Sequence, residues 1–180
     1  MRKKILLLGS TGKMGIALAD VFSVKFEVVG KNSGDFDAND FEAVRKLINQ
    51  FKPDILINTV VFLGIDPCEK EPLRALQLNT LLPRFLAERS FEKNFLLVHF
   101  STDAVFNDEK NNFYTELDFP SPLNIYGFTK YAGDCFVENI AKRYYIFRLP
   151  VLFGQSSKNT QFVEQMLLKI TQGQKVLRVA

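Results

Sequence analysis

The chain has 180 residues, of which 47% are hydrophobic and 24% charged, a composition typical of an ordinary globular domain with a sizeable core. Its 23 Lys and Arg against 20 Asp and Glu leave a net charge of only +3, which argues against a nucleic-acid partner or a polybasic membrane surface. No apolar run approaches the roughly 20 residues of a membrane span, and Gly9 and Gly12 interrupt the apolar start before a signal peptide forms. Cys68 and Cys135 lack metal-like spacing and indicate a reducing compartment, so we expect a cytoplasmic protein without a metal site.

Short apolar runs typical of strands alternate with helical patterns along the chain. In chain order, strands are expected over 5–8, 26–29, 55–57, 95–100 and 145–147, and helices over 14–22, 39–52, 73–88, 124–142 and 160–171, before a last apolar strand over 175–180. Strands that are apolar throughout are buried on both faces, and helices between them imply parallel pairing. The sequence therefore predicts an α/β fold, a Rossmann-type doubly wound parallel sheet with helices on both faces. The irregular segment 103–123, rich in Asn, Asp and Pro, is a candidate functional loop.

Three glycines, Gly9, Gly12 and Gly15, follow the first expected strand and open the first helix. In a dinucleotide-binding turn, the first permits the tight turn, the second lets the backbone approach the pyrophosphate, and the third lets the helix pack on the strand. The helix N-terminus would offer N–H donors to the anion. The spacing G-x-x-G-x-x-G favours the short-chain dehydrogenase form of this turn. The alternative is a tight strand–helix turn without a ligand.

The residues after the second strand bear on the choice of cofactor. An Asp or Glu there would bind the ribose 2′-hydroxyl of NAD, but Gly30 is followed by Lys31, Asn32 and Ser33. Lys31 would be able to meet the 2′-phosphate of NADP, so NADP is favoured, with NAD as the other option. The alternative is that Lys31 is a solvated loop lysine.

Side chains suited to proton transfer follow the fourth strand. That strand runs into Ser101 and Thr102, where ligands of open parallel sheets bind. Tyr126 and Lys130 then begin a helix, and their i, i+4 spacing places them on one helical face. In hydride transfer to a carbonyl, Tyr126 would donate a proton, Lys130 would lower the pKa of its phenol, and Thr102 would orient the carbonyl. The alternative is that Tyr126 is a partly buried helix residue and Lys130 its solvated neighbour.

These motifs resemble the extended short-chain dehydrogenase/reductases, and within them the dTDP-4-dehydrorhamnose reductase family. The resemblance covers nearly the whole chain and is carried by Gly9-Ser-Thr-Gly12-Lys-Met-Gly15, Lys52-Pro-Asp-Ile-Leu-Ile-Asn58, Val98-His-Phe-Ser-Thr-Asp103 and Ser121-Pro-Leu-Asn-Ile-Tyr126-Gly-Phe-Thr-Lys130. It implies that NADPH or NADH reduces the 4-keto group of a nucleotide-linked deoxysugar. The assemblies that it allows are a homodimer and a complex with a partner enzyme.

The resemblance also implies roles for individual residues. Thr102, Tyr126 and Lys130 would be the catalytic residues, with Lys130 also holding the nicotinamide ribose. The residues expected at the cofactor are Gly9, Thr11, Gly12, Lys13, Met14, Gly15, Lys31, Asp35, Phe36, Thr59, Val60, Val61, Asn79, Tyr126 and Lys130. His99 is interpreted as a core histidine, because the catalytic residues already supply the acid.

Two features depart from the family pattern. After Arg148 the family has Thr-Ser-Trp, whereas this chain has Leu149-Pro150-Val151 and then Leu152-Phe153-Gly154. This pattern is similar to that of wider extended reductases and epimerases, and to the regulatory beta subunit of methionine adenosyltransferase, which binds NADP without doing chemistry. The family continues past residue 180 into a C-terminal substrate domain, so we expect this chain to be a fragment that largely lacks that domain. Residues 1–180 are then expected to form an NAD(P)-binding Rossmann domain that binds dinucleotide with little or no turnover. A short natural variant with a different partner is the alternative.

Overall fold

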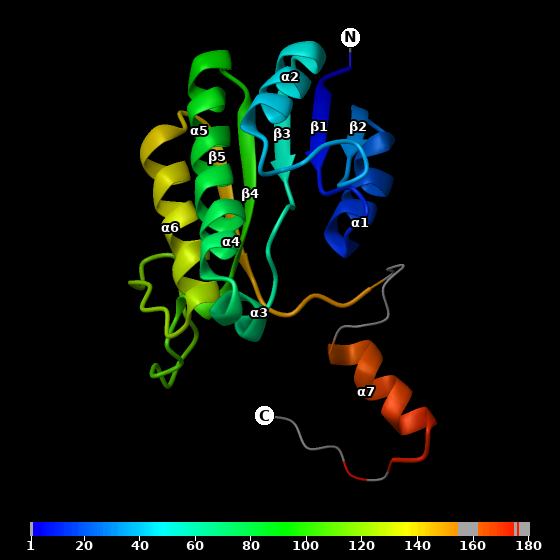
Figure 1. Ribbon diagram of the computed structural model, residues 1–180, viewed down its shortest axis with the longest axis vertical. Coiled ribbons are helices and arrows are strands. Elements are labelled where there is room, and N and C mark those ends of the chain that lie inside the picture. The colour runs from blue at the N-terminus through cyan, green and yellow to red at the C-terminus, as the bar shows by residue number, and fades with distance from the viewer. Residues whose placement is uncertain (1, 155–161, 175, 177–180) are drawn as a thin grey trace.

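The protein is built around one parallel sheet, shown with its helices in Figure 1. The computed structural model describes residues 2–154, 162–174 and 176. The strands of the described chain pair in the order β2-β1-β3-β4-β5, and they are β1 (Lys4–Leu8), β2 (Glu27–Lys31), β3 (Ile55–Asn58), β4 (Leu96–Thr102) and β5 (Tyr144–Leu149). The chain moves from β1 outward to β2 and then returns to the other side of β1 for β3. Ligands of such sheets bind outside the carboxyl ends of the strands at this reversal.

Helices connect the strands, and residues suited to helix ends set several of their limits. The helical elements are α1 (Lys13–Ser23), α2 (Phe41–Phe51), α3 (Ile65–Lys70), α4 (Pro72–Leu76), the π-helical turn η1 (Gln77–Leu81), α5 (Leu82–Lys93), the 3₁₀ turn η2 (Asp103–Val105), α6 (Ile125–Ile140) and α7 (Phe162–Thr171). Asp40 and Asn124 cap α2 and α6 by accepting hydrogen bonds from first-turn N–H groups. Lys52 and Asn94 end α2 and α5 in the left-handed conformation, at φ values of 50° and 57°.

Two hydrophobic cores lie on the two faces of the sheet. Leu6 and Leu8 of β1 pack in a core shared with α2, α5 and α6, whereas Ile5 and Leu7 pack in one shared with α1. Because successive strand residues point to opposite faces, the apolar run of β1 is buried on both sides. The predicted α/β fold, a doubly wound parallel sheet with helices on both faces, is confirmed.

Several expected boundaries were wrong, for reasons that are local. Gly30 lies inside β2 rather than at its end, and a Cβ there would come within 2.6 Å of the Ser10 Cβ. The helix expected over 73–88 runs from Pro72 to Lys93 and contains the π-helical turn η1. The six-residue helix α3 was not expected, since it is short and contains a proline.

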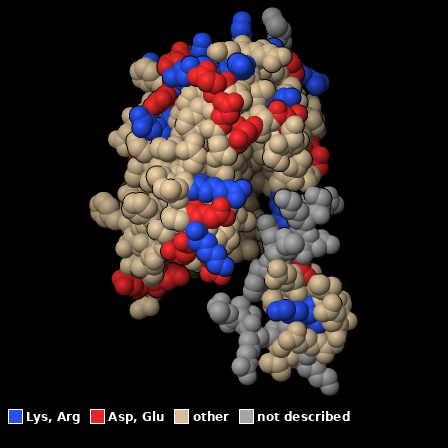
Figure 2. Space-filling model, in the orientation of Figure 1, with Lys and Arg blue, Asp and Glu red and all other residues tan. Residues whose placement is uncertain are grey.

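The C-terminal expectations are only partly testable. The helix expected over 160–171 is present as α7 from Phe162 onward, while the strand expected over 175–180 falls almost wholly outside the described residues and stays a prediction. In the described part of the chain, no helix combines the length and apolar character needed to cross a membrane. Figure 2 shows basic and acidic side chains interspersed on the face in view, in keeping with the small net charge.

Candidate active site

The glycine turn lies at the carboxyl end of β1, beside the reversal of strand order. Gly9 has a φ of +85°, which favours glycine, and its N–H donates to the carbonyl of Lys31 at 2.8 Å. A Cβ on Gly15 would lie 2.3 Å from the carbonyl oxygen of Gly9, so only glycine fits there. A Cβ on Gly12 would meet nothing closer than 3.5 Å. Gly12 is therefore not required by the fold itself, and its exposed surface is open to a ligand.

Thr59 directly follows β3 and forms hydrogen bonds with the glycine turn. Its hydroxyl donates to the carbonyls of Leu8 and Gly9, at 2.8 Å and 3.1 Å. A Cβ on Gly9 would come within 2.5 Å of this hydroxyl oxygen. Val60 packs against the α2/α5/α6 core, whereas Val61 is 36% exposed. The three predicted residues thus follow β3 directly beside the turn.

The N-terminus of α1 is available to an anion. The helix begins at Lys13 with Gly12 as its N-cap and has no side-chain cap, so first-turn N–H groups lack an intrahelical acceptor. Thr11 is exposed next to this end. The Lys13 amine is paired with the Glu164 carboxylate of α7. A groove of about 260 Å³ lies between Met14 on α1 and the residues that follow β5. These features fit a dinucleotide phosphate, because uncapped backbone N–H donors lie next to the exposed surface of Gly12.

Lys31, at the end of β2, forms an ion pair with Asp35. Its amine lies 3.5 Å from a carboxylate oxygen of Asp35, which also accepts from the backbone N–H of Asn32 at 2.8 Å. This backbone hydrogen bond and Lys31 hold the pKa of Asp35 below its usual value. A carboxylate therefore does reach the place expected to contact the cofactor ribose, although none follows β2 directly in sequence. Phe36 packs on the edge of the α2/α5/α6 core beside this pair.

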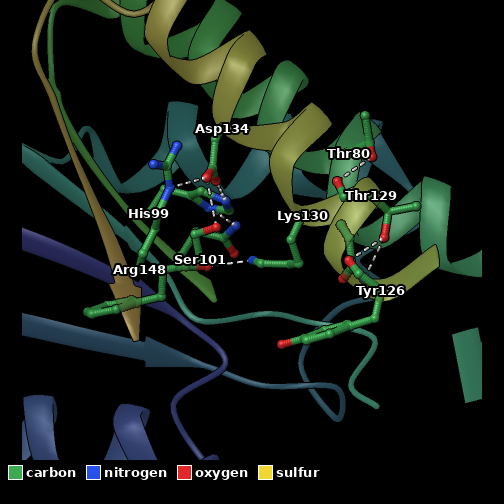
Figure 3. A network of polar contacts seen from close by, with 11 residues as sticks. Thr80, His99, Ser101, Tyr126, Thr129, Lys130, Asp134 and Arg148 are labelled. Atoms are coloured by element: carbon green, nitrogen blue, oxygen red, sulfur yellow. Dashed lines mark hydrogen bonds and ion pairs between the residues drawn. The ribbon is translucent and has the colours of Figure 1, made fainter. Parts of the chain in front are cut away.

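Tyr126 and Lys130 lie on α6 near the carboxyl end of β4 (Figure 3), and Thr102 ends that strand. Thr102 is the last residue of β4, and its hydroxyl accepts from the Ala104 N–H at 3.1 Å. Burial raises the pKa of Tyr126, and a hydrogen bond with Thr102 opposes that effect. Lys130 follows one turn later on α6, and its amine donates to the carbonyl of Phe100. With only 2% of its surface exposed, Lys130 is not a solvated neighbour.

One expectation about this group is wrong in its net direction. The pKa of Tyr126 is raised rather than lowered, because burial outweighs the opposing hydrogen bond with Thr102. Burial also lowers the pKa of Lys130, to about 8. Lys130 is thus an ammonium at neutral pH and loses its charge within the range in which enzymes are commonly assayed.

Asn79, expected to contact the cofactor, is fully buried in η1. Its amide donates to the carbonyl of Phe62 at 3.0 Å and to the Thr129 hydroxyl at 3.3 Å, and its oxygen accepts from the Phe62 N–H at 2.9 Å. Through these hydrogen bonds, Asn79 links the segment after β3 to α6. A contact with a cofactor stays a prediction.

The sequence reasoning missed a buried polar group next to Lys130. Asp134 stands one turn further along α6, is 1% exposed, and accepts from Ser101 and Arg148. His99 is buried beside it, as expected for a core histidine. The signal was present in the sequence, because an acidic residue four positions after Lys130 continues the face that carries Tyr126.

The side chains that could bind a metal are scattered in the described part of the chain. Cys68 is buried and Cys135 half-buried, and both are free thiols. Within residues 2–154, 162–174 and 176, no group of three or more His, Cys, Asp and Glu side chains could hold a metal ion.

Comparisons with known proteins agree with the fold and the motifs. A family model described as the RmlD substrate binding domain matches residues 2–180. The dTDP-4-dehydrorhamnose reductase of Aggregatibacter actinomycetemcomitans is 30% identical over 91% of this chain and 56% of its own length. The methionine adenosyltransferase 2 subunit beta of Rattus norvegicus is 32% identical over 87% of this chain and 49% of its own length.

Solved structures of dTDP-4-dehydrorhamnose reductases have a similar fold. The crystal structure of dTDP-4-dehydrorhamnose reductase from Bacillus anthracis in complex with NADP has a TM-score of 0.90 and 28% identity, over 96% of this chain and 61% of that one. The chain spans 49% to 61% of the length of these three relatives. The resemblance to dTDP-4-dehydrorhamnose reductases is confirmed, and the chain belongs to the family of the RmlD substrate binding domain.

Proposed function

We propose that residues 1–180 form the NAD(P)-binding domain of a reductase that uses NADPH to reduce the 4-keto group of a nucleotide-linked deoxysugar. The observation that carries the proposal is the buried Lys130 ammonium one helical turn from Tyr126, at the same carboxyl edge of the sheet as the glycine turn. The names of the A. actinomycetemcomitans and B. anthracis relatives support the substrate and the cofactor.

The described residues fit NADP in the proposed site. The N-terminus of α1 and the open surface over Gly12 would receive the pyrophosphate. Lys31 would pair with the 2′-phosphate in place of Asp35, and Lys130 would donate to the nicotinamide ribose. When bound, the reduced nicotinamide supplies a hydride to the carbonyl carbon of the sugar.

The proton comes from Tyr126 in this proposal. Its raised pKa keeps the phenol protonated at neutral pH, so Tyr126 carries a proton to the alkoxide that forms on the sugar oxygen. The Lys130 ammonium then stabilises the phenolate. The Thr102 hydroxyl, which has one proton to donate, holds the carbonyl in line with Tyr126. Burial of the lysine strengthens these charge interactions, because the local dielectric is lower than that of water.

The test is NADPH oxidation by the full-length product of the gene with dTDP-4-dehydrorhamnose. The proposal requires oxidation that depends on the sugar and is faster with NADPH than with NADH. A matched reaction with a nucleotide sugar that lacks a keto group is the control. Absence of oxidation with any keto-sugar, although NADPH binds, would count against the proposed reductase.

A second candidate is a non-catalytic NADP-binding subunit of a partner enzyme. The specific observations in its favour are the match to methionine adenosyltransferase 2 subunit beta and the Leu149-Pro150-Val151 segment at the end of β5. A stable complex with a second enzyme and no turnover would support it. The intact group of Thr102, Tyr126 and Lys130 favours the reductase. We propose a cytoplasmic location in either case, in keeping with the two free cysteines.

A further inference from the structure

A buried carboxylate lies one turn of α6 beyond Lys130 (Figure 3). Asp134 is 1% exposed, and one of its oxygens, Oδ2, accepts from the Ser101 hydroxyl at 2.8 Å and from Arg148 Nε at 3.3 Å. Its other oxygen, Oδ1, has no hydrogen-bond partner among the described residues. A buried charge is costly unless other groups compensate it, so the partners of Asp134 decide its charge state.

The hydrogen bonds around His99 fix which of its ring nitrogens carries the proton. The Asn58 side-chain oxygen accepts from the Val60 N–H at 3.1 Å, which leaves its amide nitrogen facing His99 Nδ1 at 3.4 Å. An amide nitrogen only donates, so Nδ1 accepts and Nε2 carries the proton. Nε2 faces Asp134 Oδ1 at 3.6 Å. Burial, and then the charge of Lys130, hold the pKa of His99 well below its usual value, so the ring is a neutral donor.

Asp134 is therefore surrounded by donors on three sides. Burial raises its pKa, while the hydrogen bond from Ser101 and the charges of Lys130 and Arg148 oppose that effect. A carboxylate that meets only donors is favoured in its ionised form, since a protonated carboxyl would need an acceptor. The structure thus supplies a negative charge next to a lysine that is otherwise enclosed by protein.

A nearby negative charge would stabilise the buried ammonium of Lys130. Burial lowers its pKa to about 8, and Asp134 acts in the opposite direction. Its amine donates to the backbone carbonyl of Phe100, which carries no full charge. The titratable and charged groups around it are Tyr126 and Asp134 on α6, His99 on β4 and Arg148 on β5, with Cys68 on α3 and Asp103 on η2 interacting with Tyr126. Arg148 is a cation, and His99 and Tyr126 are neutral. The carboxylate that acts on Lys130 is that of Asp134, one turn further along the same helix.

We propose that Asp134 is a positioning residue whose buried carboxylate keeps Lys130 in the ammonium form at neutral pH. Its relevance to catalysis rests on the proposed function, in which that ammonium serves Tyr126 and the cofactor. Ser101 and Arg148 take part by holding the carboxylate in place from β4 and β5. The cluster makes the charge of Lys130 depend on residues that touch neither substrate nor cofactor.

The experiment is an NMR titration of the protein carrying lysine labelled with ¹³C at Cε, without cofactor or substrate. The Lys130→Arg variant identifies the Lys130 signal by its loss. In Asp134→Asn, which keeps the side-chain shape, the midpoint of Lys130 falls by about one pH unit or more, a tenfold smaller ratio of ammonium to amine at a given pH. In the matched control Glu138→Gln, which removes an exposed charge from the same helix, the midpoint stays at the wild-type value.

The outcomes separate this proposal from others. A folded Asp134→Asn protein whose Lys130 midpoint equals that of the wild type would overturn it. If Asp134→Asn does not fold, Ser101→Ala decides: the proposal requires a smaller shift in the same direction, and an unchanged midpoint contradicts it. Because the readout needs no turnover, a protein that fails to reduce keto-sugars still tests the role of Asp134.

Discussion

The two halves of the site are built on different principles. At the end of β1, the turn from Gly9 to Gly15 is shaped by the absence of side chains, and added methyl groups at two positions would collide with backbone or a hydroxyl. At the end of β4, the site is made of buried polar side chains, with Lys130 and Asp134 almost fully enclosed. The glycine turn therefore depends on close backbone packing, whereas the group around Lys130 depends on buried charges. Steric changes should damage the first half, whereas isosteric changes should suffice to disable the second.

The largest effect is expected from Gly15→Ala. Its Cβ would lie 2.3 Å from the Gly9 carbonyl oxygen, and backbone atoms of Ser10 are nearly as close, so α1 must shift. We expect a loss of about 3 kcal/mol in the free energy of unfolding, together with loss of NADPH binding. Urea unfolding and fluorescence titration with NADPH measure the two effects. Unchanged stability would show that the turn is not held by this close contact.

A smaller and more selective effect is expected from Gly12→Ala. The added Cβ meets no atom closer than 3.5 Å, so the loss of unfolding free energy should be about 1 kcal/mol or less. If the pyrophosphate approaches Gly12 closely, the Kd for NADPH should rise by about tenfold or more, since the new methyl group occupies the ligand's place. A variant that binds NADPH like the wild type would place the pyrophosphate elsewhere.

The charge at Lys31 is expected to affect the choice of cofactor only. In Lys31→Gln, the Kd for NADPH should rise by about tenfold while that for NADH changes little, because only NADPH carries the 2′-phosphate. Asp35, which pairs with Lys31, remains in place and should then favour NADH. Equal changes for both cofactors would mean that Lys31 does not contact the 2′-phosphate.

The smallest effect concerns stability and pH at His99, the single histidine of the chain. Its folded-state pKa lies well below the unfolded value of 6.5, so the unfolded chain binds a proton that the folded protein does not. Below pH 6.5, the unfolding free energy should therefore decrease as the pH falls, by at most about 1.4 kcal/mol per pH unit from this group. In His99→Gln, unfolding curves between pH 7 and 5 should show a shallower decrease. The same slope in both proteins would contradict a neutral, buried His99.

The glycine turn was predictable because all of its requirements lie within seven consecutive residues. The spacing from Gly9 to Gly15, between an apolar strand and a helix, already contained the information that the structure shows in φ angles and close contacts. The i, i+4 spacing of Tyr126 and Lys130 was predictable in the same way. Both patterns are local, and both survive in the folded protein.

The environment of Lys130 was only partly predictable, because Asp134 shares its helical face but the partners of Asp134 come from across the sheet. Asp134 receives its hydrogen bonds from residues 33 positions earlier and 14 positions later in the chain. Likewise, the π-helical turn at Asn79 occurs where α6 approaches so closely that a Cβ on Gly133 would lie 2.3 Å from the Asn79 carbonyl oxygen. Sequence spacing does not report such contacts, and so the direction of the pKa of Tyr126 was predicted wrongly.

The measurement that tests the central claim most directly is the rate of sugar-dependent NADPH oxidation by Tyr126→Phe in the full-length protein. The variant lacks only the phenolic hydroxyl, so its Kd for NADPH should stay within about threefold of the wild type. The rate with dTDP-4-dehydrorhamnose should fall by about 100-fold or more, because the proton donor is gone. Equal rates in the two proteins would contradict the assignment of Tyr126 as the proton donor.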